Sequence, residues 1–173
     1  MILDFLKKWS GALVTTRKEL FVGAIGASIG LLCTEAICRW TLGVSQPWFV
    51  IPMGASAVLL FAVPASPLAQ PWSIIGGNTV SALSGIISYK LFGDSGIAIA
   101  LAGGLAVSSM FFFRCVHPPG GAIALTAVLG SDLIHALGFE FAFMPVMFDS
   151  AILLLIAILF NRLAGRKYPH HPQ

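Results

Sequence analysis

The sequence predicts an all-α membrane protein with four transmembrane helices plus two short re-entrant or half-spanning helices, arranged as a two-fold internal repeat. The composition predicts a membrane protein: 57% of the 173 residues are hydrophobic, 10% are charged, and the mean hydropathy is +0.91. A soluble domain carries about 25% charged residues, so most of this surface is expected to face lipid. The 18 glycines and 10 prolines suit helices that pack closely and break at defined points.

The first segment, residues 1–19, is expected to lie along the inner surface of the membrane as an amphipathic helix. Its apolar side chains fall roughly on one helical face: Ile2, Phe5, Leu6, Trp9 and Leu13. Four basic residues accompany them: Lys7, Lys8, Arg17 and Lys18. A frayed cationic tail is the alternative interpretation of this segment.

Four apolar stretches approach the roughly 20 residues that a spanning helix needs. They are residues 20–43, 73–92, 95–113 and 146–163. Two further apolar stretches, residues 53–63 and 119–130, are shorter, and at ~1.5 Å per residue each reaches about half of the hydrocarbon thickness. We expect these two short helices to re-enter the membrane. Six crossings, with the short helices as thin spans, are the alternative.

The charge distribution predicts that both termini lie in the cytoplasm. Seven of the ten lysines and arginines lie outside the spans at the two ends of the chain, four before residue 20 and three after residue 161. The positive-inside rule places such ends on the inner side of the membrane. Lys90 favours the inner side for the turn after the second span. The connections at residues 44–72 and 114–145 are then expected on the outer side.

The two short apolar helices resemble each other in sequence. "PMGASAVLLFAV" at residues 52–63 aligns with "PPGGAIALTAVL" at residues 118–129. The alignment pairs Pro52 with Pro118, Gly54 with Gly120, Ala55 with Gly121, and Leu59 with Leu125. Chance similarity between two capped apolar helices is the alternative. A true repeat would divide the single membrane domain, residues 1–173, into a first repeat at 20–92, a second repeat at 93–163 and a cytoplasmic tail at 164–173. If the short helices re-enter, the halves share one orientation and their two-fold axis follows the membrane normal.

The motifs "PMGAS" at residues 52–56 and "HPPGGA" at residues 117–122 each predict a helix start that exposes backbone amides to a cavity. Proline supplies no N–H and suits the first helical turn, and glycine lets a ligand approach closely. The start of a helix carries a partial positive charge and binds anions. With Arg114 and His117 beside one of them, two facing helix starts predict a site for a small anion.

The candidate substrate-binding residues are Pro52, Gly54, Ala55, Ser56, Asn78, Arg114, His117, Pro118, Pro119, Gly120 and Gly121. Arg114 would raise the local concentration of the anion, and His117 would orient it or couple it to a proton. Structural roles are the alternatives: helix capping for the prolines and glycines, an interfacial anchor for Arg114, and a buried, satisfied polar group for His117. Asn78 opens the second span and is a candidate to point into the cavity. The same span carries a stripe of small residues that is expected to pack against another helix: Gly77, Ser81, Ser84, Gly85 and Ser88.

Several other classes of function are not favoured by the sequence. It contains no nucleophile beside a base, no carboxylate pair at workable spacing, no phosphate loop, and no HxxH or HExxH pattern, so we expect no enzyme, no cofactor and no metal site. The net charge of +3 is too small to indicate a nucleic acid as partner. The expected partners are a small inorganic anion, the lipid bilayer and further copies of the chain, because few helices are available to enclose a pathway. Glu35 and Arg39, four residues apart, are expected to form an ion pair.

Three motifs closely resemble the HPP family of integral membrane proteins, which is named for the His-Pro-Pro sequence found here at residues 117–119. They are "IPMGASAVLLFAVPASPLAQPWSIIGGN" (51–78), "RCVHPPGGAIALTAVLG" (114–130) and "NRLAGRKYPH" (161–170). The resemblance covers about residues 20–170. It implies four transmembrane segments and occurrence in bacteria, cyanobacteria and plastids. Plastid and cyanobacterial members are associated with nitrite transport.

The resemblance therefore implies a transporter of a small monovalent anion, with nitrite first, and here we expect it in the inner membrane of a bacterium. A membrane-embedded structural or regulatory subunit is the alternative, and it predicts tight packing around both glycine turns and no polar cavity. A membrane enzyme that uses His117 is a further alternative, and it would need a second acid or base nearby.

Overall fold

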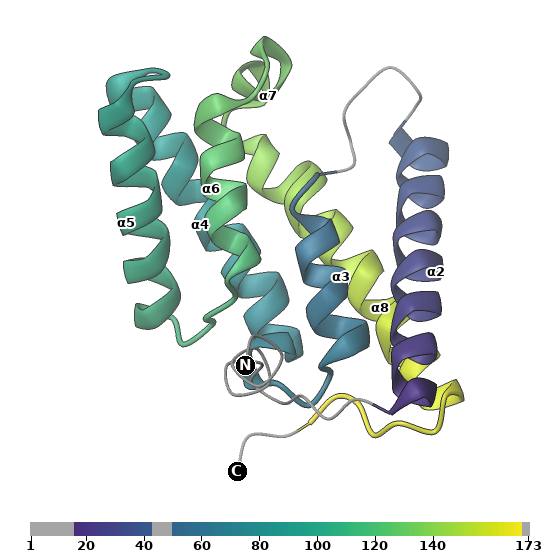
Figure 1. The fold of residues 1–173 in the computed structure, drawn as a ribbon. Coiled ribbons are helices and arrows are strands. Elements are labelled where there is room, and N and C mark those ends of the chain that lie inside the picture. Colours follow the sequence, from purple (N-terminus) through teal and green to yellow (C-terminus); the bar gives the residue numbers. More distant parts are fainter. Residues whose placement is uncertain (1–15, 43–49, 171–173) are drawn as a thin grey trace, which may run out of the picture.

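The computed structural model describes residues 16–42 and 50–170, and every regular element within this part of the chain is helical (Figure 1). The elements are α2 (Arg17–Leu42), α3 (Met53–Ala62), the 3₁₀-helix η1 (Pro67–Ala69), α4 (Pro71–Phe92), α5 (Gly96–Phe112), α6 (Pro119–Leu129), α7 (Asp132–Leu137), the π-helical turn η2 (Ala142–Met147) and α8 (Phe148–Leu163). The prediction of an all-α protein is confirmed. Most of the expected amphipathic segment at residues 1–19 lies outside the described residues.

Two helices are long and apolar enough by themselves to cross a membrane. They are Arg17–Thr41 within α2 and Ala142–Leu163, in which η2 continues into α8. The shorter apolar helices are α3, α5 and α6. Local sequence sets several of the boundaries: α4 and α6 begin at a proline, which suits the first turn. The Ser95 hydroxyl accepts the N–H of Ala98 at the start of α5.

One end of the molecule, called here the terminal end, gathers the start of α2 and the segment that follows α8. Arg166 donates to the carbonyl of Glu19 in α2 over 3.3 Å and to the carbonyl of Phe61 in α3 over 2.7 Å. At the same end, Trp72 at the start of α4 donates to the carbonyl of Phe113 after α5 over 2.9 Å. The terminal end therefore holds the first turn of α2 and α4 and the last turn of α3, α5 and α8 (Figure 1).

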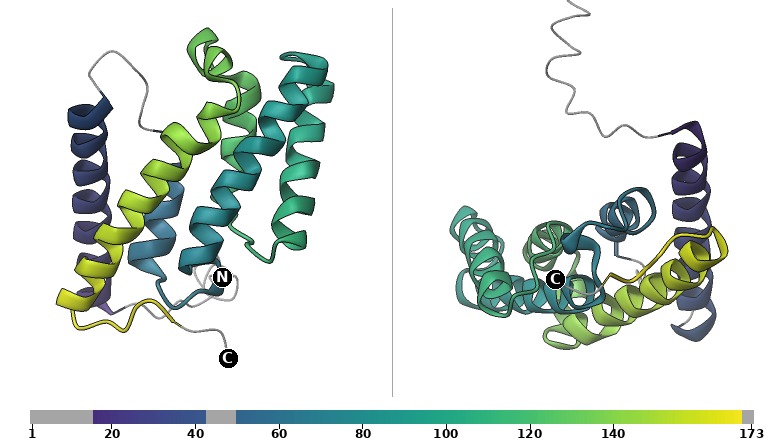
Figure 2. Two further views of the ribbon diagram at one scale, coloured as in Figure 1. Left: turned by 180° about the vertical axis from the view of Figure 1, so that it is seen from behind. Right: turned by 90° about the horizontal axis from the view of Figure 1, so that it is seen from below.

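The opposite end, called here the distal end, holds the other ends of the same helices. Asp149, near the start of α8, accepts the N–H of Val50 just before α3 over 3.0 Å and the thiol of Cys38 in α2 over 2.9 Å. The ring of His135 in α7 stacks on Tyr89 near the end of α4 with centroids 3.7 Å apart. Consecutive long and short helices therefore alternate in direction through the molecule (Figures 1 and 2).

The predicted re-entrant helices are not confirmed, because α3 and α6 each run from one end of the molecule to the other, as the alternative of six crossings expects (Figure 1). α3 runs from the distal to the terminal end, and α6 runs back (Figure 1). Two side assignments were consequently wrong. Lys90 lies at the distal end, 5.4 Å from the centre of the Phe139 ring, and Arg114 lies at the terminal end beside Phe113. Both residues follow α3 in the chain, and the prediction failed because it turned α3 back to the end at which it begins, whereas α3 runs through to the terminal end (Figure 1).

The six longer helices form two bundles of three. α4, α5 and α6 pack against one another, and α2, α3 and α8 form the other bundle (Figure 2). The predicted repeats at residues 20–92 and 93–163 stay a prediction, and neither bundle coincides with one of them. α4 of the predicted first repeat packs with α5 and α6, and α8 of the predicted second repeat packs with α2 and α3.

The backbones of α4 and α6 lie close together because glycines line the contact between the two helices. A Cβ added at Gly85 would lie 2.2 Å from the carbonyl oxygen of Ala124 and 2.8 Å from the Cβ of Ala127. A Cβ at Gly120 would lie 2.6 Å from the hydroxyl of Ser81. The small-residue stripe predicted on α4 therefore packs against α6, as small residues do between membrane helices.

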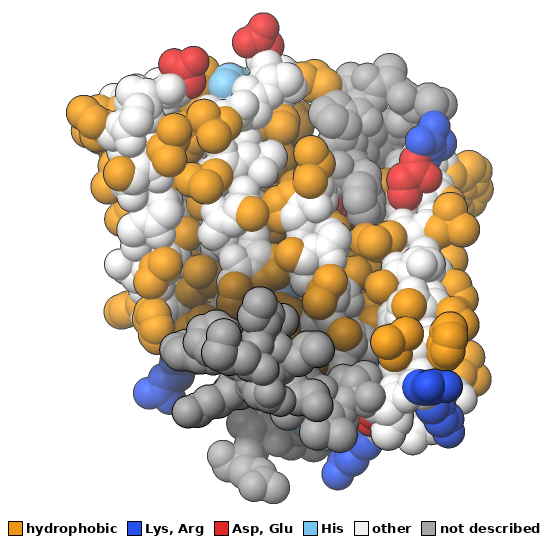
Figure 3. Space-filling view, viewed as in Figure 1, with side chains coloured by type: hydrophobic (Ala, Val, Ile, Leu, Met, Phe, Trp, Pro, Cys, Tyr) orange, Lys and Arg blue, Asp and Glu red, His pale blue; other side chains and the backbone are white. Residues whose placement is uncertain are grey.

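Charged side chains divide between the two ends, and apolar side chains cover the flanks between them (Figure 3). Trp40, Leu32 and Phe111 are 87%, 68% and 67% exposed, which suits contact with lipid tails. The terminal end carries Arg17, Lys18, Arg114, Arg162, Arg166 and Lys167, and the distal end carries Asp94, Asp132 and Glu140. The predicted pair of Glu35 with Arg39 is confirmed, with a 2.7 Å hydrogen bond from Nε.

The α4–α6 contact predicts unequal effects of adding a methyl group at two helical glycines. Gly85→Ala should lower the free energy of unfolding by about 1–3 kcal/mol, because the methyl overlaps a backbone carbonyl. Gly104→Ala, on α5 with no atom within 4 Å of the added Cβ, should leave stability unchanged or raise it by about 0.5–1 kcal/mol. Denaturant unfolding in detergent measures both, and equal effects would contradict the packing.

The alternation of helices predicts which positions share a side of the membrane. In a cysteine-free background, Arg114→Cys and Lys167→Cys should react with an impermeant thiol reagent from one side of sealed vesicles. Asp94→Cys should react only from the other side. The opposite outcome would support four spans with re-entrant helices. In that case Asp94→Cys and Lys167→Cys would react from the same side, and Arg114→Cys would react from the other side.

Candidate functional site

His117 is fully buried where the two bundles meet, in the extended segment between α5 and α6. Its Nε2 lies 2.8 Å from the hydroxyl of Ser56 in α3, and its Nδ1 lies 2.9 Å from the carbonyl oxygen of Leu68 in η1. A carbonyl oxygen only accepts, so Nδ1 carries the ring proton. In the neutral ring, Nε2 then accepts the hydroxyl proton of Ser56. One side chain thus links α3, η1 and the start of α6.

Two glycines of α4 make room for the chain that carries His117. A Cβ at Gly77 would lie 2.5 Å from the carbonyl oxygen of Cys115 and 2.7 Å from the Cβ of His117. A Cβ at Gly76 would lie 3.1 Å from the Cβ of Cys115. The irregular backbone is also paired within the protein, since the N–H of Cys115 donates to the carbonyl of Met110 over 2.9 Å. Such pairing is what a non-helical segment needs inside a membrane.

A second polar contact joins the bundles between α4 and α8. The amide nitrogen of Asn78 donates to the hydroxyl of Ser150 over 3.0 Å, and that hydroxyl donates to the carbonyl of Val146 over 2.7 Å. The other amide atom, Asn78 Oδ1, and the hydroxyl of Ser81 are buried without a hydrogen-bond partner among the described residues. An unpaired buried oxygen costs about 1–3 kcal/mol, so these two atoms are candidate contacts for a polar ligand.

The first amides of the two short helices are not free, which corrects the predicted anion site. In α3, Met53, Gly54 and Ala55 donate to the carbonyls of Val50, Ile51 and Pro52, and in α6, Gly120 and Gly121 donate to those of His117 and Pro118. Each helix begins with a tight turn at a proline, and the carbonyl oxygens of this turn accept the hydrogen bonds of these amides. The helix starts also do not face each other, because α3 and α6 run in opposite directions (Figure 1).

The structure brings four of the predicted site residues together around α4. Asn78 belongs to that helix, His117 and Gly120 pack on it, and Ser56 bonds to His117. The other predicted residues lie around this group in different environments. Pro52 and Pro119 are buried, Gly54 and Gly121 are half-buried, and Ala55, Arg114 and Pro118 are exposed.

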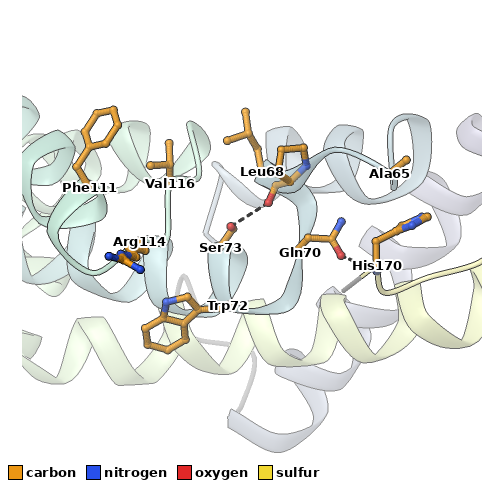
Figure 4. A pocket seen from close by; sticks show the side chains of 10 residues that line it. Ala65, Leu68, Gln70, Trp72, Ser73, Phe111, Arg114, Val116 and His170 are labelled. Atoms are coloured by element: carbon orange, nitrogen blue, oxygen red, sulfur yellow. Dashed lines mark hydrogen bonds between the residues drawn. The ribbon is translucent and has the colours of Figure 1, made fainter. Parts of the chain in front are cut away.

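Arg114 belongs to a pocket of about 750 Å³ at the terminal end. Its lining consists of Ala65, Pro67, Leu68, Gln70, Trp72, Ser73, Phe111, Arg114, Val116 and His170 (Figure 4). Leu68 lines this pocket and also bonds to His117 through its carbonyl. The pocket and the buried histidine are therefore separated by the thickness of one residue.

The C-terminal segment closes over one side of this pocket. The hydroxyl of Tyr168 donates to the carbonyl of Ala69 over 2.6 Å, and the N–H of His170 donates to the side-chain oxygen of Gln70 over 2.7 Å. Burial raises the pKa of Tyr168 above its usual range, so its hydroxyl keeps the proton that it donates. The motif at residues 161–170 thus contributes to the pocket wall.

Sequence reasoning missed several residues of this region. Ser150 had no distinguishing pattern. Gln70 and Trp72 were assigned to a connection, and Ser73 to the start of a span, although all three lie within a quoted motif. Ser81 was assigned only to helix packing. Within residues 16–42 and 50–170, no group of three His, Cys, Asp or Glu side chains is arranged to hold a metal ion.

Fold and site together define an α-helical membrane protein with a buried polar junction between two bundles. The chain belongs to the HPP family, because the family model for the transmembrane region of HPP proteins matches residues 13–169. Two relatives from Dictyostelium discoideum, described only as transmembrane proteins, are 36% and 35% identical over 96% and 97% of this chain. The chain spans 57% and 63% of their lengths. No solved structure matches it.

The His117–Ser56 contact predicts a specific loss of stability. Ser56→Ala leaves Nε2 of His117 buried without a partner, and we expect it to lower the free energy of unfolding by about 1–3 kcal/mol. Ser108→Ala is the matched control, because the exposed Ser108 hydroxyl bonds only to the carbonyl of Gly104 in its own helix. Denaturant unfolding should show a change within about 0.5 kcal/mol for the control. Equal values for both variants would contradict the contact.

Proposed function

We propose that this protein passes a small monovalent anion across the membrane, with nitrite as the first candidate, along the junction of its two bundles. The observation that carries the proposal is the concentration of buried polar groups at this junction. Ser56 meets His117 there, and Asn78 meets Ser150. Transporters built from inverted repeats hold their substrates near the midplane, at the interface of the repeats.

The pocket at the terminal end supplies an entrance of suitable charge. Arg114 lines it, and none of its described lining residues carries a carboxylate. The hydroxyl of Ser73, the amide of Gln70 and the indole of Trp72 add polar groups that tolerate a small anion. Basic residues elsewhere on the same end raise the local anion concentration further.

Beyond this entrance, hydroxyl and imidazole groups would replace part of the water around the anion. Ser56 presents its hydroxyl in the first turn of α3, and Ser81 presents a hydroxyl without a partner among the described residues. His117 is fully buried and closes the direct route from the pocket. Passage therefore requires the bundles to move apart at this contact, which favours a carrier that opens to each side in turn.

The membrane orientation that we propose places the terminal end in the cytoplasm of a bacterium. The support is the charge distribution, because six described lysines and arginines lie at this end and two, Arg39 and Lys90, lie at the other. The bacterial inner membrane is a prediction from the family resemblance, since both reported relatives come from Dictyostelium. Assembly of several copies is proposed because the six longer helices of the described residues, two of them short, enclose little space.

Two other functions have an observation in their favour. The close glycine contacts at Gly77 and Gly85 fit a structural or regulatory subunit that never opens, although the pocket beside Arg114 does not follow from such a role. The Ser56–His117 pair has the arrangement of a serine beside its base. A hydrolase would also need free amides for the oxyanion and access for water. The N–H of Ser56 bonds instead to the carbonyl of Pro52, and both side chains are fully buried.

Flux into liposomes that contain the purified protein tests the proposal. Nitrite uptake should exceed the uptake into empty liposomes. The selectivity is measured by comparing nitrite uptake with the uptake of nitrate, formate, chloride and bicarbonate. Arg114→Gln should raise the half-saturating nitrite concentration about three- to tenfold at low ionic strength, and less at high ionic strength. Lys167→Gln, at the same end but outside the pocket lining, should leave it unchanged. If none of these anions moves above the empty-liposome rate between about pH 5 and 8, transport is contradicted.

A further inference from the structure

Asp149 is a carboxyl group buried among neutral partners, outside the site described above. It lies in the first turn of α8 and is 0% exposed. One oxygen accepts the thiol of Cys38 from α2 over 2.9 Å, and the other accepts the N–H of Val50 over 3.0 Å. The carboxyl group thus holds together α2, α8 and the residue that leads into α3.

No cation among the described residues pairs with this carboxyl group. The ion pair found within that part of the chain joins Arg39 to Glu35 on α2, and both lie one turn or less from Cys38. α3, η2 and α6 contain no charged residue, and α4 contains only Lys90, close to its last turn. The titratable groups that face Asp149 are therefore the Cys38 thiol and, farther along α2, Glu35.

Such a site can take up and release one proton without losing a hydrogen bond. When ionised, the carboxylate accepts from Cys38 and from Val50. When protonated, the oxygen beside Cys38 donates its O–H to the sulfur, a weak acceptor, and the other oxygen still accepts from Val50. A buried charge without a counter-ion is strongly unfavourable inside a membrane protein. The carboxyl group is therefore expected to hold a proton while it is buried and to release that proton when the site opens to water.

The position of Asp149 connects this proton to the junction of the bundles. The next residue, Ser150, holds Asn78 of the other bundle. Val50 lies two residues before Pro52, where the first turn of α3 begins, and Ser56 of that helix holds His117. Gain or loss of a proton at the Asp149 carboxyl group therefore acts on α3 and α8, the two helices through which the bundle of α2, α3 and α8 contacts the junction.

We propose that Asp149 is a proton-binding site and that one proton accompanies each anion, an inference that rests on the proposed transport function. The carboxylate gains a proton from water on the side to which the carrier is open, and it releases that proton to water on the other side. No other bond is made or broken. A proton and a monovalent anion together carry no net charge, so the coupled step is electroneutral.

The experiment compares the wild type, Asp149→Asn and the control Glu35→Gln in liposomes. An inwardly directed proton gradient should drive nitrite accumulation in the wild type and in the control, after subtraction of the leak of nitrous acid into empty liposomes. Asp149→Asn should lower this accumulation about tenfold or more. Exchange of nitrite for nitrite at equal pH should persist in Asp149→Asn, because the amide resembles the protonated carboxyl group. Wild-type accumulation in Asp149→Asn would overturn the proposal.

A second measurement separates this inference from the transport proposal. Infrared difference spectra of the purified protein, recorded as the pH is varied, should show a buried carboxyl group that gains and loses a proton. The signal should be absent from Asp149→Asn and retained in Glu35→Gln. If Asp149→Asn fails to fold, Cys38→Ala replaces it, and the loss of the thiol should shift the titration midpoint. A missing titration, or an unchanged midpoint in Cys38→Ala, overturns the proton site. Absence of nitrite flux with an intact titration contradicts the transport proposal and the coupling, but not proton binding at Asp149.

Discussion

The close contact of Gly77 in α4 with the backbone of Cys115 and His117 is the constraint on which the rest of the site depends. An extended segment inside a membrane protein must be covered by protein, because lipid offers no hydrogen bonds. At Gly77, a single added carbon would collide with the carbonyl of Cys115 at 2.5 Å. The absence of a side chain therefore fixes where the extended segment lies, and it delivers His117 to Ser56 and Leu68.

The junction of the two bundles combines apolar packing with a few buried polar contacts. The main apolar cluster crosses it, since Phe61 of α3 and Leu153 of α8 belong to the same cluster as Ile74 of α4. Within this apolar surrounding, Ser56 bonds to His117 and Asn78 donates to Ser150. Single hydrogen bonds contribute about 0.5–1.5 kcal/mol each. The proposed transport requires these polar contacts, together with the apolar packing around them, to separate as the junction opens.

Much of the fold followed from sequence because it depends on local properties. Hydropathy identified the helices, the spacing of Glu35 and Arg39 predicted their ion pair, and the two proline-glycine motifs marked the starts of α3 and α6. The directions of α3 and α6 did not follow, since length alone does not show whether a short helix turns back or runs on. Three extended residues, 115–117, add about 10 Å to α6 at ~3.3 Å per residue. The course of α3 from one end of the molecule to the other places Lys90 and Arg114 at the ends opposite to those predicted.

The chemistry of the site was predicted less well, because it depends on contacts between distant residues. His117 and Asn78 were identified as candidates, but their partners Ser56 and Ser150 lie 61 and 72 residues away in the sequence. Proline and glycine at a helix start predicted free amides, and the preceding carbonyls turned out to occupy them. The buried acid at Asp149 has no motif around it. Only its three-dimensional surroundings distinguish it from an acidic residue at an exposed helix start.

Accessibility of residue 56 from the two sides of the membrane tests the central claim most directly. A Ser56→Cys variant in a background without the three native cysteines would be exposed to impermeant thiol reagents in sealed vesicles of known orientation. The account predicts slow reaction from either side, as the junction opens to each in turn, and slower reaction when nitrite is present. A thiol that reacts only after denaturation, with or without nitrite, would contradict a pathway between the bundles.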